Sequence, residues 1–327
     1  MMMAVKLISP FNMKYKSLLL FISSLPLLAC SKTKLVNSKA FYFDTFVETT
    51  LYDGSDENIK DIEQIFLTLD KLSDNYQTRD VKNVYSINQT NDVVEVDPAL
   101  YGMLKDVYEI KELDNFNPLI GSLSKKWKEV LKEKHVLSNE IIQAELEKLA
   151  TSALVLLSDN KVERVGEAEL DLGAVAKGFA LDKTKAYLNE KEVKQYLVNA
   201  GQSSILLGEK NTEDGLFSVG ISNLKNAYLN LKNCVVSTSS ASTQGVVIDG
   251  VTYSHIINPK TGSAINTHEA IIVVSESGYL GDALSTALVN NSIDEIKHLE
   301  EVYNVKTIVI DNSKIAYKHE SLEVLYH

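Results

Sequence analysis

Two carboxylates and a lysine surround a glycine-containing turn in the segment DLGAVAKGFALD, from Asp171 to Asp182. Gly173 and Gly178 allow close backbone approach, and the turn is predicted to open a helix whose first N–H groups lack intrahelical partners. Lys177 adds a positive charge one turn into this helix. Free N–H groups and a cation at a helix start are features that bind phosphate. An ordinary amphipathic helix with a solvated Lys177 has the same pattern, so this segment alone leaves both interpretations open.

A second segment, GDALSTAL, places Asp282 and Thr286 four residues apart, with Ser285 beside them. This spacing puts Asp282 and Thr286 on one face of a helix. Carboxylate and hydroxyl oxygens suit Mg²⁺, which prefers octahedral oxygen ligation and bridges to substrate phosphates. The alternative is a helix that begins with a capping aspartate and carries small residues for close packing.

His255 follows β-branched and aromatic residues and precedes NPKTG, whose Asn258-Pro259 and Thr261-Gly262 pairs predict a tight loop. A histidine at the rim of such a loop is able to act as a base near neutral pH. A hydrogen-bonded histidine with a purely structural role is the alternative.

These segments occur in an order that resembles a known family. DLGAVAKGFALD, YLVNAG, YSHIINPKTGSAI and GDALSTAL follow one another as they do in the FAD:protein FMN transferases of the ApbE type. The resemblance extends from about Phe41 to the C-terminus. It implies a Mg²⁺-dependent enzyme that cuts the diphosphate of FAD, transfers the FMN part to a threonine or serine hydroxyl of an exported or membrane redox protein, and releases AMP.

The resemblance implies a metal site formed by two segments. In the family, the positions of Asp282 and Thr286 bind the metal, joined by the position of Ser285 and the backbone oxygen at the position of Ala174. We therefore expect Mg²⁺ to be held by oxygen atoms of Ala174, Asp282, Ser285 and Thr286.

The resemblance also implies contacts with FAD. Asp171 and Lys177 match family positions that bind FAD, and Asp182 closes the same motif. Ile256 matches a position whose backbone contacts FAD, and the preceding histidine lies beside the diphosphate as a candidate base. Lys177 would neutralise diphosphate charge as a point cation. The expected catalytic residues are His255, Lys177 and Asp282.

Three upstream segments correspond to the flavin-binding part of the family. FDT resembles its first strand, in which the position of Phe43 touches the flavin. FNPLIG resembles an aspartate-containing loop under the isoalloxazine, with Phe116 beside Asn117, which replaces the acid and still offers hydrogen bonds. Tyr76 is the candidate for an aromatic residue that stacks on the flavin. Gln202 is a further departure, because a second glycine usually follows the segment YLVNAG.

The N-terminal residues have the pattern of an export signal. From Met13 onward, lysines precede an apolar run that ends in Leu-Leu-Ala-Cys at Cys30, which matches the bacterial lipoprotein box. We predict a signal peptide over residues 1–30, starting at Met1 or Met13, a tether over 31–40 and a catalytic domain over 41–327. Lipidated Cys30 would anchor the chain to the inner or outer membrane on its extracytoplasmic, periplasmic face. An uncleaved anchor helix is the alternative.

Composition restricts the class of protein. The 327 residues include 45% hydrophobic and 24% charged residues, as in folded globular proteins. A formal net charge of -11 without a basic stripe argues against a nucleic-acid partner. If Cys30 carries a lipid, no internal disulfide is possible, and Cys234 lies in an apolar run typical of a buried side chain.

The pattern of elements predicts an α+β fold: a single compact domain with mixed antiparallel sheets and surrounding helices, with two lobes as the alternative. Apolar spacing and caps predict helices over 57–73, 97–113, 138–149, 282–290 and 293–303, and one after the turn at Asp171. Short strands are predicted at 194–199, 203–208, 216–221, 228–237 and 245–254, the last containing a type I′ hairpin turn at Asp249-Gly250. AIIVVS is predicted to be a buried strand, and KTIVI and KIAYK are predicted to form a closing hairpin. Apolar and polar residues alternate from Ala40 to Gly54, which predicts a strand there.

A rival pattern consists of three short signatures of serine β-lactamases and penicillin-binding proteins, at residues 122–125, 158–160 and 260–262. Their contexts disagree with that function, because Ser122 precedes a highly charged segment, while the other two lie in a predicted turn and a loop. We interpret them as coincidence. Two alternatives to the transferase stay open at this point: a Mg²⁺-dependent FAD pyrophosphatase, in which water replaces the acceptor, and a non-catalytic periplasmic flavin-binding lipoprotein.

Overall fold

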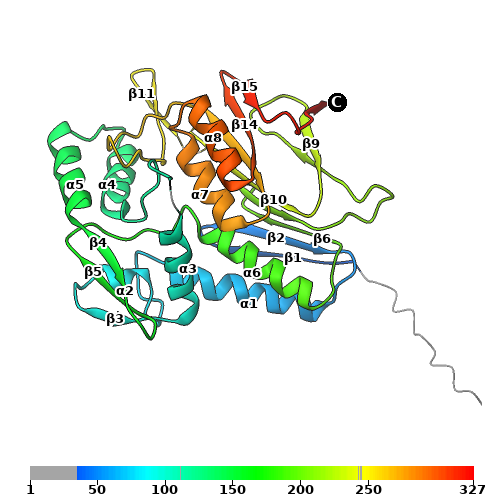
Figure 1. Ribbon diagram of the computed structural model, residues 1–327, viewed down its shortest axis with the longest axis horizontal. Coiled ribbons are helices and arrows are strands. Elements are labelled where there is room, and N and C mark those ends of the chain that lie inside the picture. The colour runs from blue at the N-terminus through cyan, green and yellow to red at the C-terminus, as the bar shows by residue number, and fades with distance from the viewer. Residues whose placement is uncertain (1–34, 111, 242, 244) are drawn as a thin grey trace, which may run out of the picture. The chain divides into compact units, whose positions relative to one another are not determined.

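An eight-stranded sheet, in which every neighbouring pair of strands is antiparallel, is the central element of the fold (Figure 1). The computed structural model describes residues 35–110, 112–241, 243 and 245–327, which belong to one compact unit. The strands in spatial order are β1 (Val36–Tyr42), β2 (Thr45–Leu51), β6 (Tyr196–Ala200), β7 (Ser204–Leu207), β10 (Cys234–Ser240), β13 (Ala270–Ser275), β14 (Lys306–Asp311) and β15 (Lys314–Lys318). This arrangement confirms the predicted α+β fold with antiparallel sheets and surrounding helices.

Both faces of the central sheet are covered, and β13 shows this best. Every residue of β13 is buried, because alternate side chains enter two different hydrophobic clusters. Ile271 and Val273 pack with the helices, whereas Ile272 and Val274 pack toward a three-stranded sheet. That second sheet consists of β16 (Leu325–Tyr326), β9 (Ala227–Leu231) and β8 (Phe217–Gly220).

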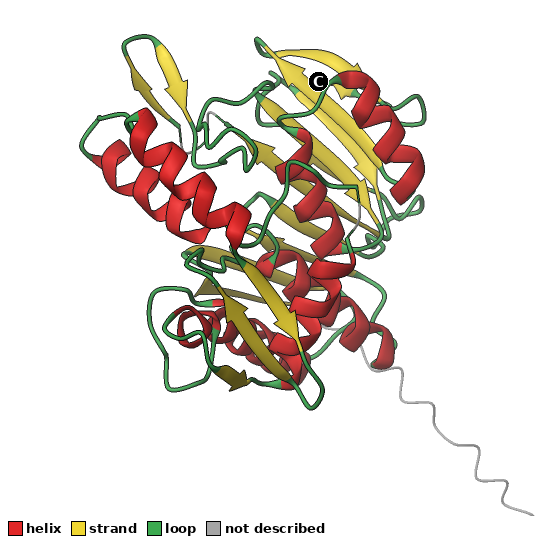
Figure 2. Ribbon diagram, turned by 60° about the vertical axis from the view of Figure 1, so that its left-hand side comes forward, coloured by secondary structure: helices red, strands yellow, loops and turns green. Residues whose placement is uncertain are grey.

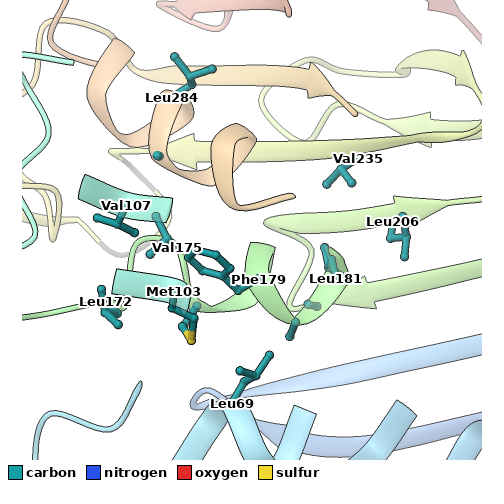
Figure 3. Close-up of a cluster of buried hydrophobic side chains, with 14 of the residues drawn as sticks. Leu69, Met103, Val107, Leu172, Val175, Phe179, Leu181, Leu206, Val235 and Leu284 are labelled. Atoms are coloured by element: carbon teal, nitrogen blue, oxygen red, sulfur yellow. The ribbon is translucent and has the colours of Figure 1, made fainter. Parts of the chain in front are cut away.

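Helices α6 (Ala176–Glu190) and α7 (Gly278–Leu288) contact each other, and α7 also lies on β10 and β13. Figure 3 shows how Phe179 of α6 and Leu284 of α7 share a cluster with Leu206 and Val235 of the sheet. Further helices pack around this core: α1 (Asp56–Ser73), which contacts α6, and α8 (Ile293–Tyr303), which contacts β14. Helix α1 begins at Asp56, one residue before the predicted start, and Ser55 caps it.

Two smaller groups of elements complete the described part of the chain, and Figure 2 distinguishes their helices from their strands. The first consists of the sheet β3 (Val93–Glu95), β5 (Lys161–Val165) and β4 (Ala153–Leu156), with α2 (Val84–Asn88) and α3 (Pro98–Glu109). The second consists of α4 (Gly121–Lys132), α5 (Asn139–Thr151) and the hairpin of β11 (Val246–Ile248) and β12 (Val251–Tyr253). The turn at Asp249-Gly250 was predicted and has positive φ at both residues, as a type I′ turn requires.

The predicted strand from Ala40 to Gly54 is wrong as a single element. Residues Phe43 and Asp44 have φ of 51° and 56° and turn the chain into the β1–β2 hairpin. The N–H of Phe43 donates to Asp70 Oδ1 at 2.8 Å, so a contact from α1 holds a turn that lacks glycine. Strand β1 begins at Val36, so residues 36–40 of the expected tether are part of the central sheet.

Two further elements differ from the prediction. The predicted strand 228–237 divides into β9 and β10, because Asn233 adopts φ of 53° between them. Helix α4 was not predicted, since its many charges hide the buried residues Leu123, Trp127 and Leu131, which share one helical face.

None of the helices in this described portion is long and apolar enough to cross a bilayer. The predicted signal peptide and Cys30 lie outside the described residues.

Candidate active site

Helices α6 and α7 approach each other through two glycines. A Cβ built on Gly178 would lie 2.3 Å from the carbonyl carbon and oxygen of Gly278, so a side chain has no room there. Next to this contact, the rings of Phe179 and Tyr279 stack with centroids 4.6 Å apart. Close approach at Gly178 was predicted to serve a ligand, but it is the backbone of α7 that occupies this space.

The carboxylate of Asp282 is buried between α7, the sheet and the start of α6. Its Oδ2 accepts a hydrogen bond from the N–H of Gly178 at 2.8 Å. Its Oδ1 accepts from the hydroxyls of Ser204 at 2.8 Å and Ser237 at 2.6 Å. Burial raises the pKa of Asp282, while the positive charge of Lys177 and these three donors oppose the rise. The carboxylate is therefore well supplied with donors and lies beside a cation.

The oxygen atoms around Asp282 fit a hard divalent cation. In the described part of the chain, no hydrogen bond to the Ala174 carbonyl is found, because the N–H of Gly178 donates to Asp282 instead. Thr286 Oγ1 donates to the Asp282 carbonyl at 2.9 Å and keeps its lone pairs. Ser285 Oγ donates to the same carbonyl and lies 3.0 Å from Ser239 Oγ on β10, so it supports the site from the sheet side. This donor set of carboxylate, hydroxyl and carbonyl oxygens suits Mg²⁺.

No group of three or more His, Cys, Asp or Glu side chains that could hold a metal occurs among the residues the structure describes. A metal at the start of α6 would therefore rely on one carboxylate together with neutral oxygens. Such an incomplete protein shell suits Mg²⁺, which usually keeps several waters and binds substrate phosphates.

Lys177 lies close enough to His255 and to Asp282 for its charge to lower the pKa of each. Lys177 is half-buried, and its ammonium forms no ion pair with any side chain of the described residues. Surrounding protein displaces water from His255, and this effect together with the charge of Lys177 lowers the pKa of His255 to about 4. Its side chain remains exposed to solvent, which moderates both effects. His255 is neutral at pH 7 and able to accept a proton.

The segment FNPLIG lies beside the start of the DLGAVAKGFALD motif. The N–H of Asp171 donates to the carbonyl of Pro118 at 2.7 Å, and Asp171 Oδ1 accepts from the N–H of Gly173. Asn117 Oδ1 accepts from the N–H of Leu119 at 2.9 Å, which shapes its loop. Burial raises the pKa of Asp171. Asn117 and Asp171, predicted from distant segments to bind FAD, are thus brought onto adjoining loops.

Two lysines of α4 surround the exposed ring of Tyr76, and the sequence analysis missed them. Lys125 Nζ and Lys128 Nζ lie 5.1 Å and 5.0 Å from the ring centroid, and Lys128 donates to Tyr76 Oη at 3.2 Å. Their charges also act on Asp171 and oppose the rise of its pKa. The three-residue spacing of the two lysines was visible in the sequence, but it gains meaning only if the segment is a helix.

Asp182 contacts the start of α7, and its predicted contact with FAD stays a prediction. Its carboxylate accepts from the N–H groups of Gly278 at 2.6 Å and Tyr279 at 3.0 Å, and from the hydroxyl of Ser277 at 2.9 Å. These contacts cap the N-terminus of α7 from a neighbouring helix. Because of this cap, α7 begins at Gly278, before the predicted start at Asp282.

The other residues predicted to contact FAD lie in the β1–β2 turn, against the main core and beside Ser254. Phe43 is half-buried in the β1–β2 turn and contacts Phe66 edge-to-face. Phe116 is half-buried against the main core. The N–H of Ile256 donates to Ser254 Oγ, and its carbonyl accepts from Ser254 and Asn266, so this backbone is already hydrogen-bonded. A role of these three residues in FAD binding stays a prediction.

Polar side chains of the rival β-lactamase signatures are engaged in other contacts. Ser122 donates to Glu145, and Lys260 pairs with Asp114 at 2.8 Å. Ser158 lies beside the turn between β4 and β5, as predicted for a hairpin. Cys234, predicted to be buried, is indeed buried on β10, and burial raises the pKa of its thiol to about 11.

The chain belongs to the ApbE family, whose model matches residues 43–309. It is 23% identical over 249 residues to the FAD:protein FMN transferase of Chlamydia muridarum, covering 74% of this chain and 78% of that protein. It is 27% identical to the FAD:protein FMN transferase of Treponema pallidum, with 59% of this chain and 60% of that protein covered.

Solved structures show the same fold. The ApbE protein of Thermotoga maritima superposes with a TM-score of 0.72 at 22% identity, covering 90% of this chain and 97% of that one. The flavin transferase ApbE of Vibrio cholerae gives a TM-score of 0.71 at 18% identity, covering 88% and 98%.

Proposed function

We propose that this protein is an FAD:protein FMN transferase that depends on Mg²⁺ and modifies a threonine or serine of an exported or membrane redox protein. The observation that carries the proposal is the convergence of Lys177, His255 and Asp282 at the start of α6 in a member of the ApbE family. These side chains come from three separate segments, and together they offer a cation, a neutral base and a carboxylate.

The residues of this chain would divide the chemistry as follows. The ammonium of Lys177, which lacks an anionic partner in the described structure, would bind the FAD diphosphate. His255 would accept the proton of the acceptor hydroxyl, whose oxygen forms a bond to the phosphorus of the FMN half. The bond from that phosphorus to the bridging oxygen breaks, and AMP leaves. Mg²⁺, held by oxygen atoms of Ala174, Asp282, Ser285 and Thr286, would supply charge that shields the diphosphate.

The low pKa of His255 makes this base sensitive to the substrate. A diphosphate bound at Lys177 would cancel part of the charge that lowers the pKa of His255. Binding of FAD would therefore raise that pKa toward neutral pH, where a general base is most effective.

The proposal is tested by incubating the full-length chain with FAD, MgCl2 and a candidate acceptor domain. A mass gain of one FMN on the acceptor together with AMP supports the transferase. FMN and AMP without a modified acceptor, across several acceptors, would point to a pyrophosphatase. Unchanged FAD despite tight binding would point to a flavin-binding lipoprotein.

A pair of lysine variants tests the site itself. Lys177→Gln removes the charge expected to bind the diphosphate, whereas Lys183→Gln removes an exposed charge from the same helix. We expect the FAD dissociation constant to rise about tenfold or more for Lys177→Gln and to stay unchanged for Lys183→Gln. Equal effects of the two variants would contradict the role of Lys177.

We also propose that the protein is a lipoprotein anchored through Cys30 on the extracytoplasmic face. The support is the lipoprotein box at the end of the apolar N-terminal run, and the central sheet begins at Val36, shortly after this cysteine. Mass spectrometry of the membrane-extracted protein tests it, because a mature chain should begin with acylated Cys30. An unmodified Cys30 in a chain that retains its first residues would refute the anchor.

A further inference from the structure

Among the described residues, three donors contact the carboxylate of Asp282 and leave one of its lone-pair positions free for a metal. An ionised carboxylate has about four lone-pair positions, two on each oxygen. The hydroxyls of Ser204 and Ser237 occupy both positions of Oδ1, at 2.8 Å and 2.6 Å. The N–H of Gly178 occupies one position of Oδ2, at 2.8 Å. One position remains, and it belongs to the oxygen at the first turn of α6.

We propose that Ser204 and Ser237 determine metal specificity: they restrict Asp282 to ligation through one oxygen and thereby select Mg²⁺ over Ca²⁺. This inference rests on the proposed function and extends it. Mg²⁺ has a small octahedral shell and binds through one or two carboxylates plus water and phosphate oxygens. Ca²⁺ takes about six to eight oxygens and often uses both oxygens of a carboxylate. Ligation by both oxygens of Asp282 would require Oδ1 to lose at least one of its two serine hydrogen bonds.

The two serines are held too firmly to move aside. They face each other directly across the antiparallel pair of β7 and β10, and they are 1% and 0% exposed. Helix α7 packs closely against Ser237, since a Cβ built on Gly281 would lie 2.8 Å from Ser237 Oγ. Neighbouring strands therefore fix the spacing of the two hydroxyls, and the helix fixes the carboxylate that they contact. This rigidity favours the ion with the stricter geometry.

The experiment measures the affinity of the full-length chain for MgCl2 and for CaCl2, each added without FAD. The affinity is obtained from the rise in the midpoint of thermal unfolding as the metal concentration increases. The variants are Ser204→Ala/Ser237→Ala and the control Ser275→Ala. Ser275 is also a buried serine of the central sheet, but its hydroxyl donates to the Ser277 carbonyl and not to Asp282. FMN transfer is measured in parallel on the wild-type protein.

We expect the wild-type protein and Ser275→Ala to bind Mg²⁺ more tightly than Ca²⁺. In the double variant the preference should fall about tenfold or more, mainly because Ca²⁺ binds more tightly. If the double variant does not fold, Ser237→Ala alone should show a smaller change in the same direction. An unchanged preference in a folded variant, or equal binding of both ions by the wild-type protein, overturns the inference. Absent FMN transfer by the wild-type protein would instead refute the proposed function.

Discussion

From the contact between Gly178 and Gly278 we predict how a side chain at residue 178 changes the free energy of unfolding. In Gly178→Ala, the new Cβ would lie 2.3 Å from two backbone atoms of Gly278 and 2.6 Å from the nitrogen of Tyr279, whereas ordinary contacts begin at 3.4 Å. Backbone atoms cannot rotate away, so α6 and α7 must separate by about 1 Å. That movement also pulls the N–H of Gly178 away from Asp282, which is 4% exposed.

The magnitude follows from three contributions. Overpacking of a close contact costs about 1–3 kcal/mol. Weakening a hydrogen bond to a buried charge costs about 1.5–3 kcal/mol. The better helix propensity of alanine returns about 1 kcal/mol. We expect the free energy of unfolding to fall by about 3 kcal/mol, together with weaker binding of FAD and Mg²⁺.

Gly102→Ala is a matched control, because Gly102 also lies inside a helix and a Cβ added there would have no neighbouring atom within 4 Å. It should stabilise the protein by about 0.5–1 kcal/mol. Urea unfolding followed by circular dichroism measures both variants against the wild-type protein. A Gly178→Ala protein within about 0.5 kcal/mol of the wild type would show that the helices tolerate the methyl group, and the reasoning would be refuted.

Three further predictions follow from other contacts. Asp182→Ala should lower the free energy of unfolding by about 1–2 kcal/mol, because α7 loses its cap, and leave FAD affinity intact; weaker FAD binding at unchanged stability would instead favour the predicted contact with FAD. An NMR titration of His255 should show a midpoint below the ordinary value of about 6.5, and this midpoint should rise in Lys177→Gln. As the pH falls through about 6.5, the unfolded chain should bind this proton before the folded chain does, which favours unfolding below that pH. An unshifted midpoint in both proteins would contradict the coupling. Gln202→Gly should raise the free energy of unfolding by up to about 1 kcal/mol, because Gln202 adopts φ of 63°, which glycine adopts without strain. A clear fall in this free energy would mean that the Gln202 side chain makes a stabilising contact.

Local patterns in the sequence were sufficient for the elements whose signals lie within a few residues. The apolar spacing of α1, the helix start at Ser138 and the Asp249-Gly250 turn are short-range features that the structure reproduces. The order of four motifs was sufficient to indicate the ApbE family. Local patterns failed at Phe43 and Asp44, where the turn depends on Asp70 of another element.

The roles of the aspartates were decided by the tertiary structure. Asp171, Asp182 and Asp282 all occur in motif segments, and nothing in their local sequence ranks them. The donors to Asp282 lie 104, 78 and 45 residues away, and those to Asp182 lie 95 to 97 residues away. The sequence by itself determined which ionisable side chains are present and which segments with strong local patterns form helices and strands. Which carboxylate caps a helix and which one faces the start of α6 depends on how distant segments pack, because a hydrogen bond forms only where folding brings its donor and acceptor together.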